Sequence, residues 1–247
     1  MTDLREDYRG YVDETELYAG RGYAPLDHRC RQLFSHVGVL EGKTMLEIGG
    51  GEGLFSLWAL ANGARKVVVL EPEAEGSTIG AGQKLEGHRR TLGIAEEWLV
   101  LQRQTLQDYE ANGQVFDLIL SYSSINHLKE SACVLLRESE NAWQRYMEIF
   151  KKVNTMLKEG GHLIISDSGH HSLWGLLGLR SPFAPTIDWR KHQDPELWRR
   201  LLNQAGFEFR AIEWHRFYPL RMLGVGWLTR FVAWVTTNQF ILTMQKP

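Results

Sequence analysis

Short apolar runs alternate with longer amphipathic segments along most of the chain. Runs of strand length and composition lie at 44–48, 66–70, 98–101, 116–120, 163–165, 207–214 and 239–244. Helical periodicity or helix-stop signals lie between them, at about 27–36, 54–61, 74–92, 141–157 and 195–204. This alternation predicts an α/β fold with a parallel sheet and helices on both faces. Ligands of such sheets bind beyond the carboxyl ends of the strands, so functional residues are expected where strands end.

The first predicted strand runs directly into a glycine-rich turn. Leu46–Ile48 is followed by four glycines within five positions, 49, 50, 51 and 53, and a predicted helix starts at Leu54. Glycine allows a tight turn and a close approach of a ligand to the backbone. The N-terminus of the following helix favours an anionic group. The spacing does not fit the dinucleotide fingerprint G-x-G-x-x-G/A, because Leu54 stands where Gly or Ala is required.

An acidic residue precedes this turn in the pattern E-x-G-x-G-x-G, which consists of Glu47, Gly49, Gly51 and Gly53. The pattern resembles motif I of the class I S-adenosylmethionine-dependent methyltransferases, and the resemblance extends over residues 43–167. It implies that the glycine backbone packs against the amino-acid part of S-adenosylmethionine and that Glu47 contacts its ammonium group. Glu71 closes the second strand, where an acid can accept hydrogen bonds from both ribose hydroxyls.

The resemblance also sets expectations for the fold and for the rest of the cofactor site. It implies one Rossmann-like domain over residues 1–247, with a seven-stranded, mostly parallel sheet and an antiparallel last strand. Many members end the third strand with an Asp that contacts the adenine amino group. This chain has Gln104 near that place, whose side-chain carbonyl can accept the same bond, and Thr105 beside it is the alternative. Ser121 and Tyr122, at the end of the fourth strand, are expected neighbours of the cofactor.

The catalytic candidates follow the fourth and fifth strands. Methyl transfer is an in-line displacement, and a hydroxyl acceptor usually needs a base beside the sulfonium. In several small-molecule methyltransferases a histidine follows strand four, so His127 is the predicted base. A histidine that caps the next helix or binds a carbonyl is an equal alternative. Asp167 with His170 suggests a metal site, but we expect no metal because no second carboxylate lies nearby in sequence.

The N-terminal part of the chain is polar and rich in tyrosine. Residues 1–26 are therefore expected to act as a cap rather than as a core element, within a helical cap that covers 1–40. Tyr11, Tyr18 and Arg21 are expected to close over the cofactor, as N-terminal segments often do in this family.

Two apolar insertions, at 172–193 and 219–236, follow strands five and six. They are expected to form a lid or pocket wall that excludes water from the reacting centre. Core packing, a homodimer interface and a peripheral membrane contact stay open for both insertions. The membrane contact is suggested by 220–235, where Arg221 and Arg230 flank an apolar, Trp-bearing stretch. That stretch is shorter than the ~20 residues that a membrane-spanning helix requires.

Composition narrows the classes of function. The chain has 247 residues, of which 43% are hydrophobic, which is ample for one core. Lys+Arg number 28 against 30 Asp+Glu, a net charge of −2, so no nucleic-acid partner is expected. Cys30 and Cys133 lie far apart without zinc spacing, and the N-terminus is charged, so a cytoplasmic protein with reduced thiols is expected.

These observations lead to one main hypothesis and two alternatives. The main hypothesis is methyl transfer from S-adenosylmethionine to an oxygen or nitrogen atom of a small-molecule acceptor with an apolar portion. A nicotinamide-dependent oxidoreductase is disfavoured by Leu54 and by the lack of a Tyr-x-x-x-Lys pair. A non-catalytic cofactor-binding or scaffold subunit is the third interpretation.

Overall fold

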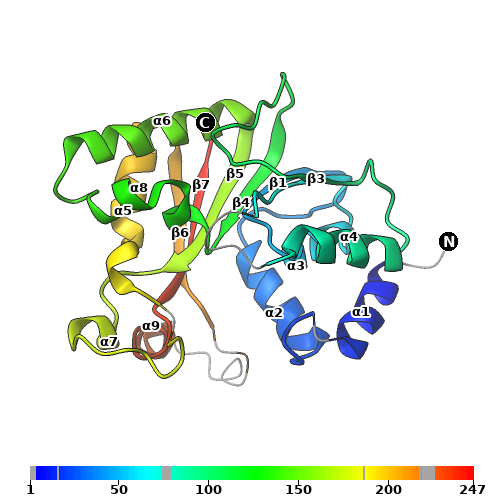
Figure 1. Cartoon of the computed structure of the whole chain (residues 1–247), viewed down its shortest axis with the longest axis horizontal. Helices are drawn as coiled ribbons and strands as arrows, with labels where there is room; N and C mark the ends of the chain where they lie inside the picture. The colour runs from blue at the N-terminus through cyan, green and yellow to red at the C-terminus, as the bar shows by residue number, and fades with distance from the viewer. Residues whose placement is uncertain (1–3, 16, 74–78, 186, 217, 219–225) are drawn as a thin grey trace. The chain divides into compact units, whose positions relative to one another are not determined.

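The computed structural model of the chain describes residues 4–15, 17–73, 79–185, 187–216, 218 and 226–247. The chain forms two compact units, Met1–Tyr122 and Ser123–Pro247, and each has its own buried apolar residues. We call them the N-unit and the C-unit. Figure 1 colours the N-unit from blue to green and the C-unit from green to red.

The described part of the N-unit contains helices and strands with these bounds: α1 Leu4–Glu14, α2 Tyr23–Leu33, β1 Thr44–Ile48, α3 Leu54–Ala61, β2 Lys66–Leu70, α4 Ala81–Thr91, β3 Leu99–Gln102 and β4 Phe116–Tyr122. These strands are parallel, in the order β3-β2-β1-β4. Val67–Leu70 are buried, as is typical of strands in a sheet that is covered on both faces. Ile48 lies opposite Leu70 on one side and Ser121 on the other. The carboxyl ends of β1, β2 and β4 therefore meet at one edge of the sheet.

The N-terminal segment is helical, as expected, but the prediction that residues 1–26 are only a cap is wrong. Tyr8 and Val12 of α1, one helical turn apart, are fully buried. The Tyr8 ring packs edge-on against Tyr23, with 6.2 Å between centroids, and its hydroxyl donates to the carbonyl oxygen of Leu54 at 3.0 Å. Burying a large apolar side chain stabilises a fold by roughly 1.5–3 kcal/mol. Helix α1 is therefore part of the core of the N-unit.

The described part of the C-unit contains these elements: a 3₁₀ helix Ile125–Lys129, α5 Glu130–Val134, α6 Glu140–Met156, β5 Leu157–Ser168, α7 Leu173–Leu176, a 3₁₀ helix Trp189–Lys191, α8 Pro195–Gln204, β6 Glu208–Trp214, α9 Gly226–Val235 and β7 Gln239–Gln245. The strand order is β5-β7-β6, and β7 is antiparallel to both neighbours. Tyr146 and Phe150 of α6 pack against Trp198 of α8, at centroid distances of 5.2 and 5.9 Å. This aromatic cluster joins the two helices in the core of the C-unit.

The strand order over the chain is β3-β2-β1-β4-β5-β7-β6, with six parallel strands and β7 antiparallel. The predicted Rossmann-like α/β fold is therefore confirmed. The insertions also fall where they were expected: α7 and the second 3₁₀ helix follow β5, and α9 lies between β6 and β7. Residues 219–225 of the second insertion lie outside the described residues. The single domain over 1–247 stays a prediction.

Several element bounds differ from the prediction. Strand β5 is longer than the predicted 163–165, because it begins directly after α6 and pairs with β7 from His162 onward. Helix α4 starts at Ala81, whereas the sequence predicted 74–92, and residues 74–78 lie outside the described residues. The short helices after β4 and β5 were not predicted. Within the described residues, no helix combines the length and hydropathy needed to cross a bilayer.

Candidate active site

The glycine-rich turn joins β1 to α3 at the carboxyl edge of the N-unit strands. Gly49, Gly51 and Gly53 have φ angles of 69°, 54° and 84°, which glycine adopts without steric cost. A Cβ atom on Gly53 would lie 2.1 Å from Leu85 Cδ1 of α4, and one on Gly50 would lie 2.3 Å from Val69 Cγ1 of β2. A Cβ atom on Gly51 would meet no atom within 4 Å. The turn is therefore closely packed on β2 and α4 and is open at Gly51, where a ligand can approach the backbone.

Glu71 follows β2 directly and is buried against this turn. Its Oε2 accepts a hydrogen bond from the backbone N–H of Gly51 at 2.7 Å, and its Oε1 accepts one from Glu73 at 3.2 Å. Its own N–H donates to the carbonyl oxygen of Gln102 at 3.0 Å, which fixes the main chain. A carboxylate offers about four lone-pair sites, so both oxygens can also accept from the hydroxyls of a ribose.

Glu47, in β1, is only 1% exposed. Its Oε2 accepts a short hydrogen bond from the hydroxyl of Ser56 on α3. Its carboxyl carbon lies 3.4 Å from the position that a Cβ of Gly50 would take, so the carboxyl group is in contact with the turn. Burial raises the pKa of the Glu47 carboxyl to about 7, although the Ser56 hydrogen bond opposes this shift. A cation placed beside Glu47 would favour the ionised carboxylate again.

The third strand ends earlier than the sequence suggested. β3 ends at Gln102, two residues before Gln104. The Gln104 amide donates to Gln102 Oε1 at 3.3 Å, and in the part of the chain that the structure describes its side-chain carbonyl accepts no hydrogen bond. The Thr105 hydroxyl donates to Asp108 Oδ2 at 2.6 Å and accepts from the Asp108 N–H at 3.2 Å. The Thr105 hydroxyl is therefore engaged in a local turn, whereas the side-chain carbonyl of Gln104 can still accept a hydrogen bond.

Ser121 and Tyr122 lie at the edge where the strands end. Ser121 is buried opposite Ile48, so the structure brings it together with Glu47, the glycine turn and Glu71. Tyr122 packs against Phe55 in the first turn of α3, with 4.3 Å between ring centroids. The predicted cofactor neighbours thus lie beside the helix that follows the turn.

A buried arginine near this edge was missed by the sequence reading. Arg29, on α2, is buried, donates a short hydrogen bond to the Tyr122 hydroxyl and lies 5.3 Å from the centroid of its ring. Its burial was not predictable, because Arg31 two positions later is exposed and the two residues look alike in sequence. Arg29 places a positive charge next to the end of β4.

Residues of the N-terminal segment make contacts of their own. The guanidinium of Arg21 lies 5.7 Å from the centroid of the Tyr18 ring. Burial raises the pKa of the Tyr18 hydroxyl, and the nearby Arg29 opposes the shift. The Tyr11 hydroxyl and His88 Nδ1 of α4 share a hydrogen bond of 2.6 Å. Closure of Tyr11, Tyr18 and Arg21 over a cofactor stays a prediction.

His127 lies in the first 3₁₀ helix of the C-unit, and its side chain is 43% exposed. Its Nδ1 is 2.6 Å from Glu130 Oε1, and Lys191 Nζ is 2.9 Å from Glu130 Oε2. These partners lower the pKa of the Glu130 carboxyl, and Lys191 contributes most. His127 thus lies in an exposed cluster of polar side chains with Glu130 and Lys191, and its role as the base stays a prediction.

A second histidine pairs with a buried carboxylate near the end of β5. Asp167 is 1% exposed, and its Oδ1 accepts from the Ser168 N–H at 2.8 Å and lies 3.2 Å from Nδ1 of His192, which is 13% exposed. Among the described residues, Asp167 Oδ2 has no hydrogen-bond partner. A carboxylate beside Nδ1 holds the proton on that nitrogen and leaves Nε2 free to accept another. No periodic signal marked His192, because it lies in the insertion, 25 residues from Asp167.

The neighbouring histidines bind main-chain or carboxylate oxygens. Nδ1 of His170 lies 2.9 Å from the carbonyl oxygen of Trp189 and 3.1 Å from that of His192. Nδ1 of His171 is 2.5 Å from Asp194 Oδ2. Over the described ranges, no three His, Cys, Asp or Glu side chains lie close enough together to hold a metal ion.

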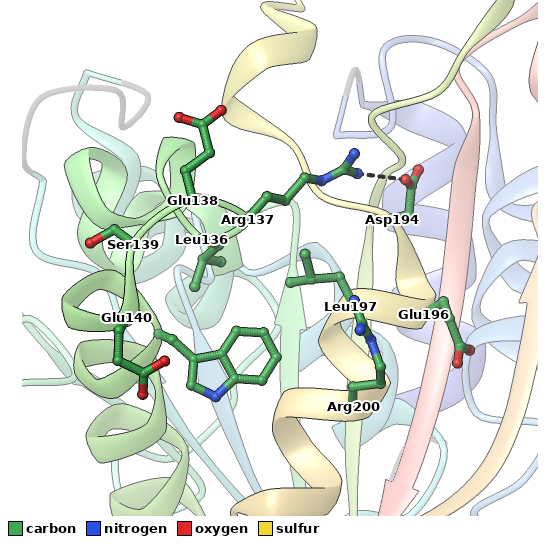
Figure 2. Close-up of a pocket in the computed structure, with 10 residues that line it drawn as sticks. Leu136, Arg137, Glu138, Ser139, Glu140, Asp194, Glu196, Leu197 and Arg200 are labelled. Carbon is green, nitrogen blue, oxygen red and sulfur yellow. Dashed lines mark hydrogen bonds and ion pairs between the residues drawn. The ribbon is translucent and has the colours of Figure 1, made fainter.

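The C-unit also contains a cavity of about 760 Å³. Its lining includes Leu136, Trp143 and Leu197, and Figure 2 shows Arg137 pointing toward Asp194 in a 2.7 Å ion pair. None of the predicted cofactor residues lines it. The cavity therefore does not correspond to the site that the glycine turn indicates.

The fold and the glycine turn together define an α/β protein of the class that binds nucleoside cofactors beyond the carboxyl ends of its strands. A family model described as a methyltransferase domain matches residues 24–212. The chain belongs to this family, as a class I S-adenosylmethionine-dependent methyltransferase with S-adenosylmethionine as its cofactor. This membership sets aside the nicotinamide-dependent and non-catalytic alternatives.

Solved structures of other methyltransferases have a similar fold. One from Mesorhizobium loti is 15% identical, with 90% of this chain and 100% of that chain covered and a TM-score of 0.62. One from Aquifex aeolicus is 13% identical, with 98% of each chain covered and a TM-score of 0.59. A geranyl diphosphate methyltransferase in complex with S-adenosylmethionine is 13% identical, with 89% of this chain and 85% of that chain covered and a TM-score of 0.59. No curated protein sequence matches the chain.

Proposed function

We propose that the protein transfers a methyl group to an oxygen or nitrogen atom of a small molecule with an apolar portion. The observation that carries the cofactor part is the open backbone of Gly51 beside the buried carboxylate of Glu71. The acceptor class is supported by the apolar insertions that follow β5 and β6. The similar fold of a geranyl diphosphate methyltransferase agrees with an acceptor that has an apolar portion.

The residues around the turn fit S-adenosylmethionine group by group. We assign the backbone of Gly49, Gly51 and Gly53 to the methionine part, Glu47 to its ammonium group and Glu71 to the ribose hydroxyls. Gln104 is assigned to the adenine amino group, with Thr105 as the alternative, and Ser121 lines the pocket. No metal is assigned.

Arg29 adds a residue to this assignment. A buried guanidinium beside the end of β4 is suited to the methionine carboxylate, because arginine forms strong charge-assisted hydrogen bonds with carboxylates. Glu47 and Arg29 would then recognise the two opposite charges of the same amino-acid group. Both residues belong to the N-unit, as do all the assigned cofactor residues.

When bound, S-adenosylmethionine supplies an activated methyl group on its sulfonium sulfur. The protein must then hold the acceptor in line and, for a hydroxyl acceptor, take up its proton. His127 is the base that the sequence predicts. His192 is a second candidate, because Asp167 orients it and leaves Nε2 as the proton acceptor.

Calorimetric titration with S-adenosylmethionine tests the cofactor assignment. We expect Gly51→Val and Glu71→Ala each to weaken binding at least about tenfold, which corresponds to the loss of roughly one strong interaction. Gly113→Val is the matched control, because Gly113 also has a positive φ of 81° and open space around it but lies outside the turn. Unchanged affinity in both test variants would refute the assignment of the turn.

The role of Arg29 has its own matched pair. Arg29→Met should weaken S-adenosylmethionine binding, whereas Arg31→Met, at an exposed position of the same helix, should leave it unchanged. An equal effect of the two substitutions would show that Arg29 does not recognise the cofactor. The cytoplasmic location and the absence of a nucleic-acid partner stay predictions.

A further inference from the structure

Exposed apolar side chains are concentrated on the insertion that follows β5. Leu176, Leu177, Leu179 and Phe183 are 55–62% exposed, and Phe231 on α9 is 53% exposed. We call these five residues the apolar surface. Single exposed apolar residues are normal, but four within eight consecutive positions form a patch of the kind that marks an interaction site.

The two segments that carry the apolar surface are hydrogen-bonded to each other. Trp174 Nε1 donates to the carbonyl oxygen of Val235 at 2.5 Å, and the buried hydroxyl of Ser181 donates to the carbonyl oxygen of Thr236 at 3.1 Å. Figure 1 shows α7 and α9 side by side. The exposed side chains are therefore held on one framework within the C-unit.

The charges along these segments are all positive. Arg180 is the only Asp, Glu, Lys or Arg in the sequence from 172 to 187, and Arg230 is the only one from 226 to 235. Beyond these segments, Asp188 forms an ion pair with Arg190 at 3.0 Å, and Asp194 and Glu196 line a pocket together with Arg230, whose guanidinium lies 5.8 Å from the centroid of the Trp214 ring. Leucine and aromatic side chains together with arginines and no acids are typical of a surface that binds anionic lipids.

We propose that the protein docks peripherally on anionic lipid bilayers through the apolar surface. The apolar side chains would enter the interfacial region while Arg180 and Arg230 meet lipid phosphates. A second copy of the chain fits this surface less well. A two-fold dimer would bring the same patch of each copy together, and with it Arg180, which has no acid within 172–187 to balance it.

Vesicle sedimentation with the full chain tests the proposal. We expect binding to vesicles of phosphatidylcholine mixed with phosphatidylglycerol, weaker binding to phosphatidylcholine alone, and loss of that difference at high salt. Leu177→Ser combined with Phe183→Ser should lower partitioning roughly tenfold or more, because each side chain loses its apolar burial. Val39→Ser combined with Val115→Ser, at exposed positions of the N-unit, is the matched control and should bind like the parent.

Two results would overturn this proposal. One is the absence of sedimentation with both kinds of vesicle. The other is a dimer in analytical ultracentrifugation that Leu177→Ser with Phe183→Ser abolishes, because the surface would then bind a second copy. Arg180→Gln with Arg230→Gln should remove only the preference for anionic lipid. The assay needs neither cofactor nor acceptor, so its result is independent of the proposed methyl transfer.

Discussion

At the scale of single residues, folding and cofactor binding favour different protonation states of the Glu47 carboxyl group. Its pKa is raised from 4.5 to about 7 by burial, so the folded protein favours the protonated carboxyl. Between these values the folded state binds the proton more tightly than the unfolded chain, so stability falls as the pH rises through this window. Above about pH 7 the free energy of unfolding has fallen by its full amount, about 3 kcal/mol relative to low pH. An ammonium group, in contrast, requires the ionised form.

The variant Glu47→Gln separates the effect of this residue on stability from its effect on cofactor binding. Glutamine keeps the shape and the acceptor for Ser56 but has no charge to bury. We expect urea unfolding to show a stability gain of up to about 3 kcal/mol at about pH 8 and a much smaller gain at about pH 5. Calorimetry should show weaker S-adenosylmethionine binding. Glu138→Gln, at an exposed position, is the control, and an equal gain at both pH values in Glu47→Gln would contradict the argument.

The two candidate bases are distinguished by turnover. If His192 accepts the acceptor's proton, His192→Ala should lower the rate of labelled-methyl transfer about a hundredfold or more, as is usual for loss of a general base. Affinity for S-adenosylmethionine should change little. His127→Ala, at the exposed histidine paired with Glu130, should then retain most of its turnover. The opposite ranking of the two variants would support the sequence-based prediction of His127.

The acids and glycines at strand ends could be predicted from the sequence. A charge is unfavourable within a buried strand, so an acid next to such a strand is informative. Glu47, Gly51 and Glu71 come together at one edge of the strands as their spacing indicated. The roles of Arg29 and His192 could not be predicted from the sequence. Each depends on a hydrogen-bond partner that is distant in sequence, 93 residues away for Arg29 and 25 for His192. Pairings between distant segments leave no local pattern.

At the scale of elements, Gly53 is the position at which the glycine-rich turn packs closely against α4. An added Cβ there would collide with Leu85 Cδ1 at 2.1 Å, and the φ of 84° is unfavourable for alanine. We expect Gly53→Ala to destabilise the protein by roughly 1–3 kcal/mol in urea unfolding. Gly87→Ala, in α4 with open space around it, should instead stabilise by about 0.4–1 kcal/mol. A neutral Gly53→Ala would show that the turn readily adapts.

The helices and strands were predictable wherever an apolar run had a clear end. β2 agrees with the predicted 66–70, and α3 agrees with 54–61. The prediction was wrong for α1, because an abundance of polar residues indicates a surface segment, whereas Tyr8 and Val12 lie on one helical face and are buried. The short helices after β4 and β5 were missed because five residues or fewer give no measurable periodicity.

At the scale of the whole molecule, the location of the assigned cofactor residues bears on how the chain unfolds. All the assigned cofactor residues belong to the N-unit, and the candidate bases belong to the C-unit. A ligand stabilises only what unfolds together with its binding site. Cofactor binding therefore reports whether residues 1–247 behave as the single domain that the sequence predicts.

Scanning calorimetry with and without S-adenosylmethionine gives the last prediction. At about a hundred times its Kd, the ligand should stabilise the protein by about 2.7 kcal/mol. For a chain of this size that corresponds to a rise in Tm of about 5–10 °C. We expect one transition that moves as a whole, no shift with a nicotinamide dinucleotide, and a reduced shift for Gly51→Val. Two transitions, of which only one shifts when S-adenosylmethionine is added, would contradict the single domain. A shift with the nicotinamide dinucleotide alone would contradict the assigned cofactor.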